Sequence, residues 1–126
     1  MNGLHLIADL KDCRCPPRQL LAAGWLADFC VSACHKHGVT VVGQLFHTFT
    51  DTTGEPAGVT GTVVLAESHL AIHTWPELAS VTLDVYVCNY SGDNSARARG
   101  LFAEVITAFS PENKVVQEIV RGRPGA

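Results

Sequence analysis

The sequence lacks a surplus of positive charge. Nine Lys and Arg stand against twelve Asp and Glu over 126 residues, which gives a formal net charge of −3. Nucleic-acid binders need a concentrated positive field, because contacts to phosphate supply much of the affinity. The basic residues are scattered, apart from Arg97, Arg99, Arg121 and Arg123. We therefore expect no nucleic-acid partner.

A long apolar run is also missing. Residues 1–10 alternate polar and apolar side chains, and no basic segment precedes an apolar stretch. A membrane-spanning helix needs about 20 mostly apolar residues, and a secretory signal needs a basic start followed by an apolar region. We expect no membrane association and a cytoplasmic protein.

The five cysteines do not form an even set. Without a secretory signal, an odd number is typical of reduced thiols and not of a disulfide framework. A zinc site is the alternative reading of six residues: Cys13, Cys15, Cys30, Cys34, His35 and His37. Their spacing differs from the usual paired zinc motifs, and Cys30 and Cys34 fit the inner face of a helix. We expect no metal site.

Apolar periodicity predicts six strands and two helices in one domain, residues 1–126, without repeats or linkers. The expected strands span residues 3–10, 39–49, 59–66, 69–75, 81–88 and 114–120. One helix should follow Pro16-Pro17 and end before Gly38, and the other should begin near Asp93 or Asn94. Short connections between strands favour antiparallel pairing. The fold class is α+β, a two-layer sandwich with both helices packed on one face of an antiparallel sheet.

The segment of greatest chemical interest is ESHLAIHTWPE, residues 67–77, followed by Cys88. Glu67 and Ser68 fall at the tight connection between two expected strands. A serine held in a strained turn can present its hydroxyl to the carbonyl before it. Taken alone, such a serine is usually an ordinary turn residue, and a lone cysteine such as Cys88 usually packs as a small hydrophobe.

Together these residues resemble the small prokaryotic S-adenosylmethionine decarboxylase proenzymes. The resemblance extends from residues 4–9 (LHLIAD) through 46–49 (FHTF) and 58–61 (GVTG) to 118–123 (EIVRGR). Members of that family make their own pyruvoyl cofactor by cutting their chain. The resemblance therefore implies self-cleavage between Glu67 and Ser68, giving chains 1–67 and 68–126.

The resemblance also assigns roles at the cleavage site. Ser68 attacks the carbonyl of Glu67, and elimination followed by hydrolysis leaves a pyruvoyl group derived from Ser68. His73 matches the histidine that assists elimination, although an odd spacing from Ser68 means that strand curvature or a bulge must help them meet. Thr60 takes the place of a serine that assists processing, and its extra methyl group could slow cleavage.

Three further positions match substrate-binding residues of the family, and Cys88 matches its proton donor. Phe49 and Trp75 should offer aromatic faces to the adenine, and Glu77 a carboxylate to the ribose hydroxyls. A thiol can return a proton to the substrate Cα, because thiols titrate near pH 8.5 and stay mostly protonated at neutral pH. The family implies a homodimer and a product used for spermidine synthesis.

Two other functions remain open at this point. A pyruvoyl enzyme of the same lineage could decarboxylate ornithine or arginine, for which the long loop 50–58 and the unusual Asn89-Tyr90 leave room. A homologue that is never cleaved could act as a regulatory subunit. Retention of Ser68, His73 and Cys88 together argues against the second reading.

Overall fold

The computed structural model describes residues 2–122, so that Arg123, part of the family resemblance, lies outside the described residues. Six strands carry the fold: β1 (Gly3–Cys13), β2 (Thr40–Thr50), β3 (Pro56–Ala66), β4 (Ser68–Trp75), β5 (Ser80–Cys88) and β6 (Pro111–Arg121). The helices are α1 (Arg18–Leu21), α2 (Ala23–Lys36) and α3 (Ser95–Phe109), with a 3-10 turn, η1, at Pro76–Leu78.

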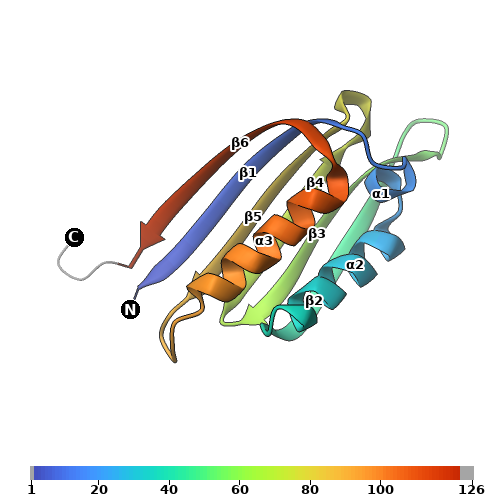
Figure 1. Ribbon diagram of the computed structural model, residues 1–126. Helices are drawn as coiled ribbons and strands as arrows, with labels where there is room; N and C mark the ends of the chain where they lie inside the picture. The colour runs from blue at the N-terminus through green and yellow to red at the C-terminus, as the bar shows by residue number, and fades with distance from the viewer. Residues whose placement is uncertain (1, 123–126) are drawn as a thin grey trace.

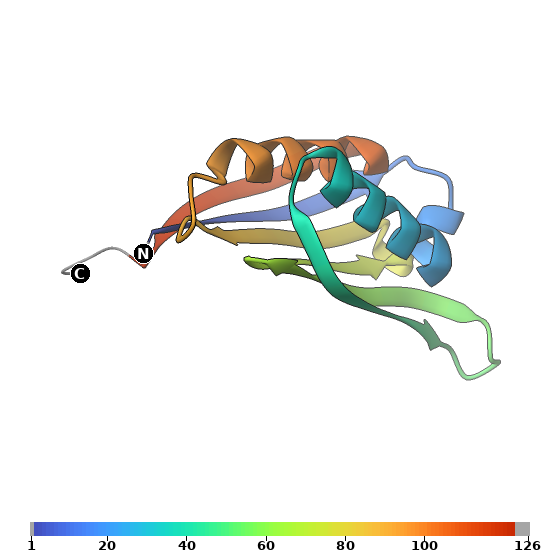
Figure 2. The same cartoon turned by 90° about the horizontal axis from the view of Figure 1, so that it is seen from below.

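All six strands form one sheet in the order β2-β3-β4-β5-β1-β6, with every neighbouring pair antiparallel. The helices α2 and α3 lie side by side across one face of this sheet (Figure 1). Turned by 90°, the molecule shows both helices on the same side and the opposite face uncovered (Figure 2). The expected two-layer α+β sandwich is confirmed. None of the helices among residues 2–122 is both long and apolar enough to cross a membrane.

The core lies between the helices and the sheet. Strand β5 buries Val81, Leu83, Val85 and Val87 and leaves the alternate residues partly exposed, as its period-2 pattern predicted. Each fully buried Leu, Ile, Val or Phe contributes about 1.5 to 3 kcal/mol through removal of apolar surface from water. The largest such side chains are Phe109, Leu6, Leu10, Leu26, Leu70, Ile72 and Leu101.

The first helical segment differs from its prediction. We expected one helix after Pro17, but Ala22 adopts an extended conformation, with φ −104° and ψ 103°, and separates α1 from α2. The apolar stripe also differs, because Trp25 and Phe29 are only partly buried and stack on each other. The residues of α2 that are buried are Leu26, Ala27, Cys30, Ala33 and Cys34. Cys30 and Cys34 therefore do face the core, as expected.

The loop between β2 and β3 is shorter than the nine residues expected from the sequence. β2 continues to Thr50 and β3 begins at Pro56, which leaves residues 51–55 as the connection. The Asp51 carboxylate closes this turn by accepting hydrogen bonds from the backbone N–H groups of Thr53 and Glu55, at 2.8 and 3.0 Å. The Thr53 hydroxyl also hydrogen-bonds to this carboxylate. That bond has the largest effect and, together with the two backbone bonds, lowers the pKa of Asp51.

The uncovered face of the sheet carries the residues of functional interest. In β4, Leu70, Ile72 and Thr74 are buried toward the helices, so His69, His73 and Trp75 point to the other side. Large apolar side chains remain exposed on this open face, among them Leu45 at 75%, Phe49 at 51% and Trp75 at 44%. A monomer thus leaves an extended, partly apolar sheet face without a covering layer.

Candidate active site

The serine expected to react lies at the first residue of β4, directly after the hairpin turn. Ser68 pairs with Leu65 of β3 and with Val87 of β5. Its φ of +101° falls in a region that favours glycine. A residue of another type in such a region costs on the order of 1 to 3 kcal/mol, and strain of this kind is common at reactive sites. The strained turn expected from the sequence is therefore present at Ser68.

Glu67 and Cys88 accompany Ser68 at this end of the sheet. The hydroxyl of Ser91 donates a short hydrogen bond to the carboxylate of Glu67. That bond, with smaller contributions from the Ser91 and Tyr90 backbones and the Cys88 side chain, lowers the pKa of Glu67. Cys88 ends β5, one residue beyond Val87, the pairing partner of Ser68. The structure thus brings together the residue pair that is expected to be cleaved and the expected proton donor.

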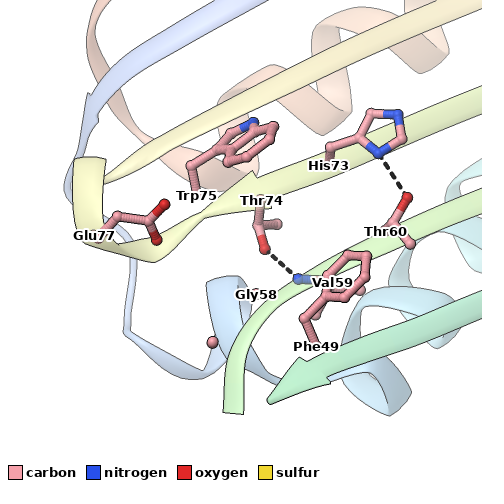
Figure 3. A pocket seen from close by; sticks show the side chains of 9 residues that line it. Phe49, Gly58, Val59, Thr60, His73, Thr74, Trp75 and Glu77 are labelled. Atoms are coloured by element: carbon pink, nitrogen blue, oxygen red, sulfur yellow. Dashed lines mark hydrogen bonds between the residues drawn. The ribbon is translucent and has the colours of Figure 1, made fainter. Parts of the chain in front are cut away.

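The other five expected site residues meet at the opposite end of β4, around one pocket. This pocket has a volume of about 340 Å³, and its walls include Phe49, Thr60, His73, Trp75 and Glu77. Phe49 comes from the end of β2, Thr60 from β3, His73 and Trp75 from β4, and Glu77 from η1 (Figure 3). Its lining is mostly apolar, and the carboxylate of Glu77 stands at its edge.

Two hydrogen bonds order the pocket. Thr60 Oγ1 lies 2.7 Å from His73 Nδ1, and the two residues face each other directly across β3 and β4. The buried Thr74 accepts a hydrogen bond from the Val59 N–H at 2.8 Å and donates one to the Leu20 carbonyl at 2.7 Å. Thr74 therefore ties the end of β4 both to β3 and to α1, which holds the neighbouring His73 and Trp75 in place.

Glycine is required where β3 runs beside the pocket. Gly58 has a φ of +148°, a conformation that side chains rarely tolerate, and a Cβ there would lie 3.0 Å from the carbonyl oxygen of Thr74. At Gly61 a Cβ would lie 2.1 Å from the ring of Phe46. The GVTG segment of the sequence thus combines close backbone approach with the hydroxyl of Thr60.

Within one chain the two groups of site residues do not meet. The β3–β4 pairing runs without a bulge from Leu65 and Ser68 to Thr60 and His73. Five strand residues at about 3.3 Å each place the Cα atoms of Ser68 and His73 roughly 16 Å apart. The expectation that curvature or a bulge brings His73 to Ser68 is therefore wrong for a single chain.

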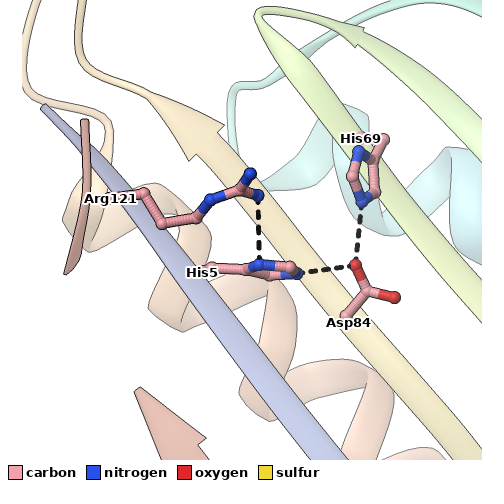
Figure 4. Close-up of polar contacts among 4 residues, drawn as sticks. All are labelled: His5, His69, Asp84 and Arg121. Carbon is pink, nitrogen blue, oxygen red and sulfur yellow. Dashed lines mark hydrogen bonds and ion pairs between the residues drawn. The ribbon is translucent and has the colours of Figure 1, made fainter. Parts of the chain in front are cut away.

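A further polar cluster, which the sequence did not reveal, lies on the open face between the two groups (Figure 4). The Nε2 atoms of His5 and His69 lie 2.9 and 2.8 Å from the same oxygen of Asp84. Arg121 Nη1 lies 3.3 Å from Nδ1 of His5, and its guanidinium stands 4.3 Å from the ring centre of Tyr86. His5, His69, Asp84 and Arg121 come from four different strands, so only the cross-strand register could have identified the cluster.

Two histidines and one carboxylate are a possible ligand set for a transition metal. The groups around these residues do not favour a bound metal ion. A metal on Nε2 of His5 requires a proton on Nδ1, yet the donor Arg121 faces that atom, and a second cation nearby adds repulsion. The cluster is better described as an Asp84 side chain that accepts hydrogen bonds from two imidazoles.

Comparison with known proteins shows that the chain is similar to members of one protein family. The family model described as S-adenosylmethionine decarboxylase matches residues 4–122. A protein named S-adenosylmethionine decarboxylase proenzyme from Thermodesulfovibrio yellowstonii is 34% identical over 120 residues, covering 95% of this chain and 81% of the relative. One of the same name from Syntrophomonas wolfei is 38% identical over 122 residues, covering 95% and 86%.

The fold has a counterpart of similar sequence among solved structures. The crystal structure of the adenosylmethionine decarboxylase from Aquifex aeolicus matches with a TM-score of 0.81 and 31% sequence identity. The match covers 96% of this chain and 91% of that one. The likeness thus extends to the whole arrangement of the sheet and its helices.

Proposed function

Because the chain belongs to the S-adenosylmethionine decarboxylase family, we propose that it is a self-cleaving, pyruvoyl-dependent decarboxylase of S-adenosylmethionine. Its product would serve as the aminopropyl donor for spermidine synthesis in the cytoplasm. The observation that carries the proposal is the grouping of residues: Glu67, Ser68 and Cys88 at one end of β4, and a nucleoside-sized pocket at the other.

The position of Ser68 supports self-cleavage between Glu67 and Ser68. Its hydroxyl oxygen attacks the Glu67 carbonyl carbon and displaces the amide nitrogen, which gives an ester. Loss of the Ser68 Hα proton then breaks the bond between Cβ and the oxygen, and the electron pair leaves with the oxygen as the Glu67 carboxylate. Addition of water and loss of ammonia convert the remaining residue 68 into a pyruvoyl group. The positive φ of Ser68 supports this proposal, because cleavage relieves the strain.

A pyruvoyl group at residue 68 would supply a ketone for the substrate amine and a neighbouring amide carbonyl that can accept electrons as carbon dioxide leaves. The residues of the chain do the rest. Cys88 follows Val87, the pairing partner of Ser68, and this position supports a role for its thiol as proton donor to the substrate Cα. A proton donor is needed there because decarboxylation leaves an electron pair on that carbon.

The pocket supports a nucleoside substrate over a small diamino acid. Phe49 and Trp75 present two aromatic side chains, and Glu77 adds one carboxylate, within a pocket of about 340 Å³. Aromatic faces suit the adenine and attract a sulfonium by roughly 0.5 to 2 kcal/mol. Ornithine and arginine have no flat ring to occupy such walls. The alternative substrates are therefore less well matched to this pocket.

The distance between the two groups leads us to propose a homodimer with shared active sites. If Ser68 and Cys88 of one protomer meet His73 and Thr60 of its partner, a reacting serine and its assisting histidine come together. A twofold axis parallel to the sheet and perpendicular to β4 produces this arrangement, because it lays the Ser68 end of one sheet over the His73 end of the other.

The open face is suited to such packing. Sheets stack face to face at about 10 Å, and the exposed Leu45, Phe49 and Trp75 would lose contact with water there. The same stacking would cover His5, His69 and Asp84, which are already hydrogen-bonded to one another through one oxygen of the Asp84 carboxylate. Burial of a polar cluster costs little when its members are already paired.

Intact mass under denaturing conditions, followed by an activity assay, tests this function. We expect two chains, residues 1–67 and 68–126, the second blocked by pyruvoyl, and release of carbon dioxide from S-adenosylmethionine. Parallel assays with ornithine and arginine should show little turnover. Preference for either amino acid would refute the substrate, and a single uncut, inactive chain would favour a regulatory subunit.

A further inference from the structure

A second cavity is lined by Glu67, the residue before Ser68, and is distinct from the nucleoside pocket. It has a volume of about 170 Å³, and its lining residues include Gly38, Glu67, Ser91, Asn94 and Arg97. Polar groups make up most of the lining. The cavity therefore reaches the residue whose carbonyl is proposed to be attacked, and its groups suit a polar or charged occupant.

Arg97 is the cation of this cavity. Its Nη1 donates a hydrogen bond to Asn94 Oδ1 at 3.0 Å, and no carboxylate among residues 2–122 comes within 4.0 Å of its guanidinium. Arg99, two residues along the same helix, is different: its Nε and Nη2 donate to the carboxylate of Glu118 at 3.2 and 2.9 Å. In the uncut chain, Arg97 is thus a guanidinium with capacity for an anion.

Self-cleavage would create a new anion near Arg97. The oxygen that leaves Ser68 stays on Glu67 as part of a new α-carboxylate, next to a side-chain carboxylate that is already ionised. That side chain takes the hydrogen bonds of Ser91 and Cys88, so these donors are occupied. The new charge needs another partner. A water molecule takes about 30 Å³, so the cavity has room for a carboxylate with some of its solvent.

We propose that this cavity receives the carboxylate formed at Glu67 by self-cleavage, and that Arg97 binds it. The proposal rests on the self-cleavage described above. A guanidinium offers two parallel N–H groups that match the two oxygens of a carboxylate. Arg97 would then meet the negative charge as it develops on the leaving oxygen, and would afterwards hold the new C-terminus in place.

A comparison of cleaved and uncut proteins tests the proposal. Arg97→Gln is made in the wild-type chain and in the uncut Ser68→Ala chain, with Arg99→Gln as the matched control. We expect Arg97→Gln to lower the Tm of the cleaved protein by about 3 °C or more and to leave the Tm of the uncut protein nearly unchanged. Arg99→Gln should shift both forms equally, because Glu118 is present in each.

The outcomes separate the two proposals. The Arg97→Gln effect on the cleaved form should shrink in about 1 M salt, which shortens the screening length to roughly 3 Å. If Arg97→Gln blocks cleavage, restoration by Arg97→Lys supports the proposal and failure of restoration overturns it. Equal Tm shifts in the cleaved and uncut forms also overturn it. If the wild-type chain is never cut, self-cleavage itself is refuted, whatever Arg97 does.

Discussion

The two ends of β4 differ in what they hold and in what they lack. The first end has a strained serine, a carboxylate and a thiol: Ser68, Glu67 and Cys88. The far end has a hydrogen-bonded histidine and an aromatic pocket. The first end holds the bond that is proposed to be cut but lies far from His73, and the far end holds His73 but lies far from that bond.

The comparison teaches that proximity in sequence is misleading here. Residues 67–77 form one continuous motif, yet an extended strand separates its two functional parts by roughly 16 Å. Such a motif can form a complete active site if each end of β4 meets the opposite end of β4 in a second copy of the chain. The dimer we propose explains why both halves are present on a single short strand.

The largest effect is expected at the serine. Ser68→Ala removes the only oxygen that can attack the Glu67 carbonyl from residue 68, so cleavage and decarboxylation should both fall to background. Intact mass and carbon dioxide release measure the two effects. Ser32→Ala, an exposed serine on α2, is the control and should cleave normally. An uncut but active Ser68→Ala protein would end the pyruvoyl argument.

The second-largest effect is expected at the thiol of Cys88. Cys88→Ala should still yield the two chains but lose turnover by about 100-fold or more, the usual worth of a positioned proton donor. Cys15→Ala, another thiol that is not fully buried, should keep full activity. Normal turnover of Cys88→Ala would show that the proton comes from elsewhere.

The pocket at the far end should respond differently. Trp75→Leu removes an aromatic wall without touching Ser68, so cleavage should be normal while KM rises roughly tenfold, equivalent to about 1.4 kcal/mol. Trp25→Leu, which alters a stacked tryptophan on α2, provides the control. If KM is unchanged in Trp75→Leu, the nucleoside does not use this wall.

A small effect is expected away from both ends, where α2 meets α3. The Glu104 carboxylate accepts hydrogen bonds from Lys36 at 3.0 Å and His37 at 2.9 Å, and these bonds lower its pKa. Its stabilising contribution is therefore complete above the ordinary pKa of 4.5 and is lost as the pH falls through the lower folded-state pKa. Lys36 is largely exposed and Glu104 and His37 are partly exposed, so solvent screens these interactions and the contribution is small.

Thermal unfolding between pH 3 and 7 measures this contribution. Glu104→Gln should lower Tm by less than about 3 °C at pH 7, and the difference from wild type should vanish at the acidic end of the range. Asp28→Asn, an exposed change on α2, is the control. A difference that persists unchanged at pH 3 would show that charge at Glu104 is not its source.

Sequence patterns predicted much of the fold for clear physical reasons. Alternating Val81, Leu83, Val85 and Val87 can only bury one face of a strand, and the glycine after α2 adopts the positive φ that such a position requires. The break at Ala22 was not predictable, because alanine favours helix and only the packing of α1 and α2 decides its conformation.

The resemblance supplied the residues of the candidate site but not their arrangement in space. The resemblance identified Phe49, Trp75 and Glu77, which do share one pocket. Sequence spacing could not show that His73 lies far from Ser68, since that depends on a regular register between β3 and β4. The cluster of His5, His69 and Asp84 was missed for the same reason.

The most direct test of shared active sites is cleavage in mixed dimers. His73→Ala and Ser68→Ala chains with different tags are produced separately and together, and their intact masses are measured. Neither should be cut alone. Together, up to about half of the His73→Ala chains should be cut, because a mixed dimer has one complete centre. If His73→Ala chains stay uncut with this partner, or cut themselves at the normal rate alone, the shared site is refuted.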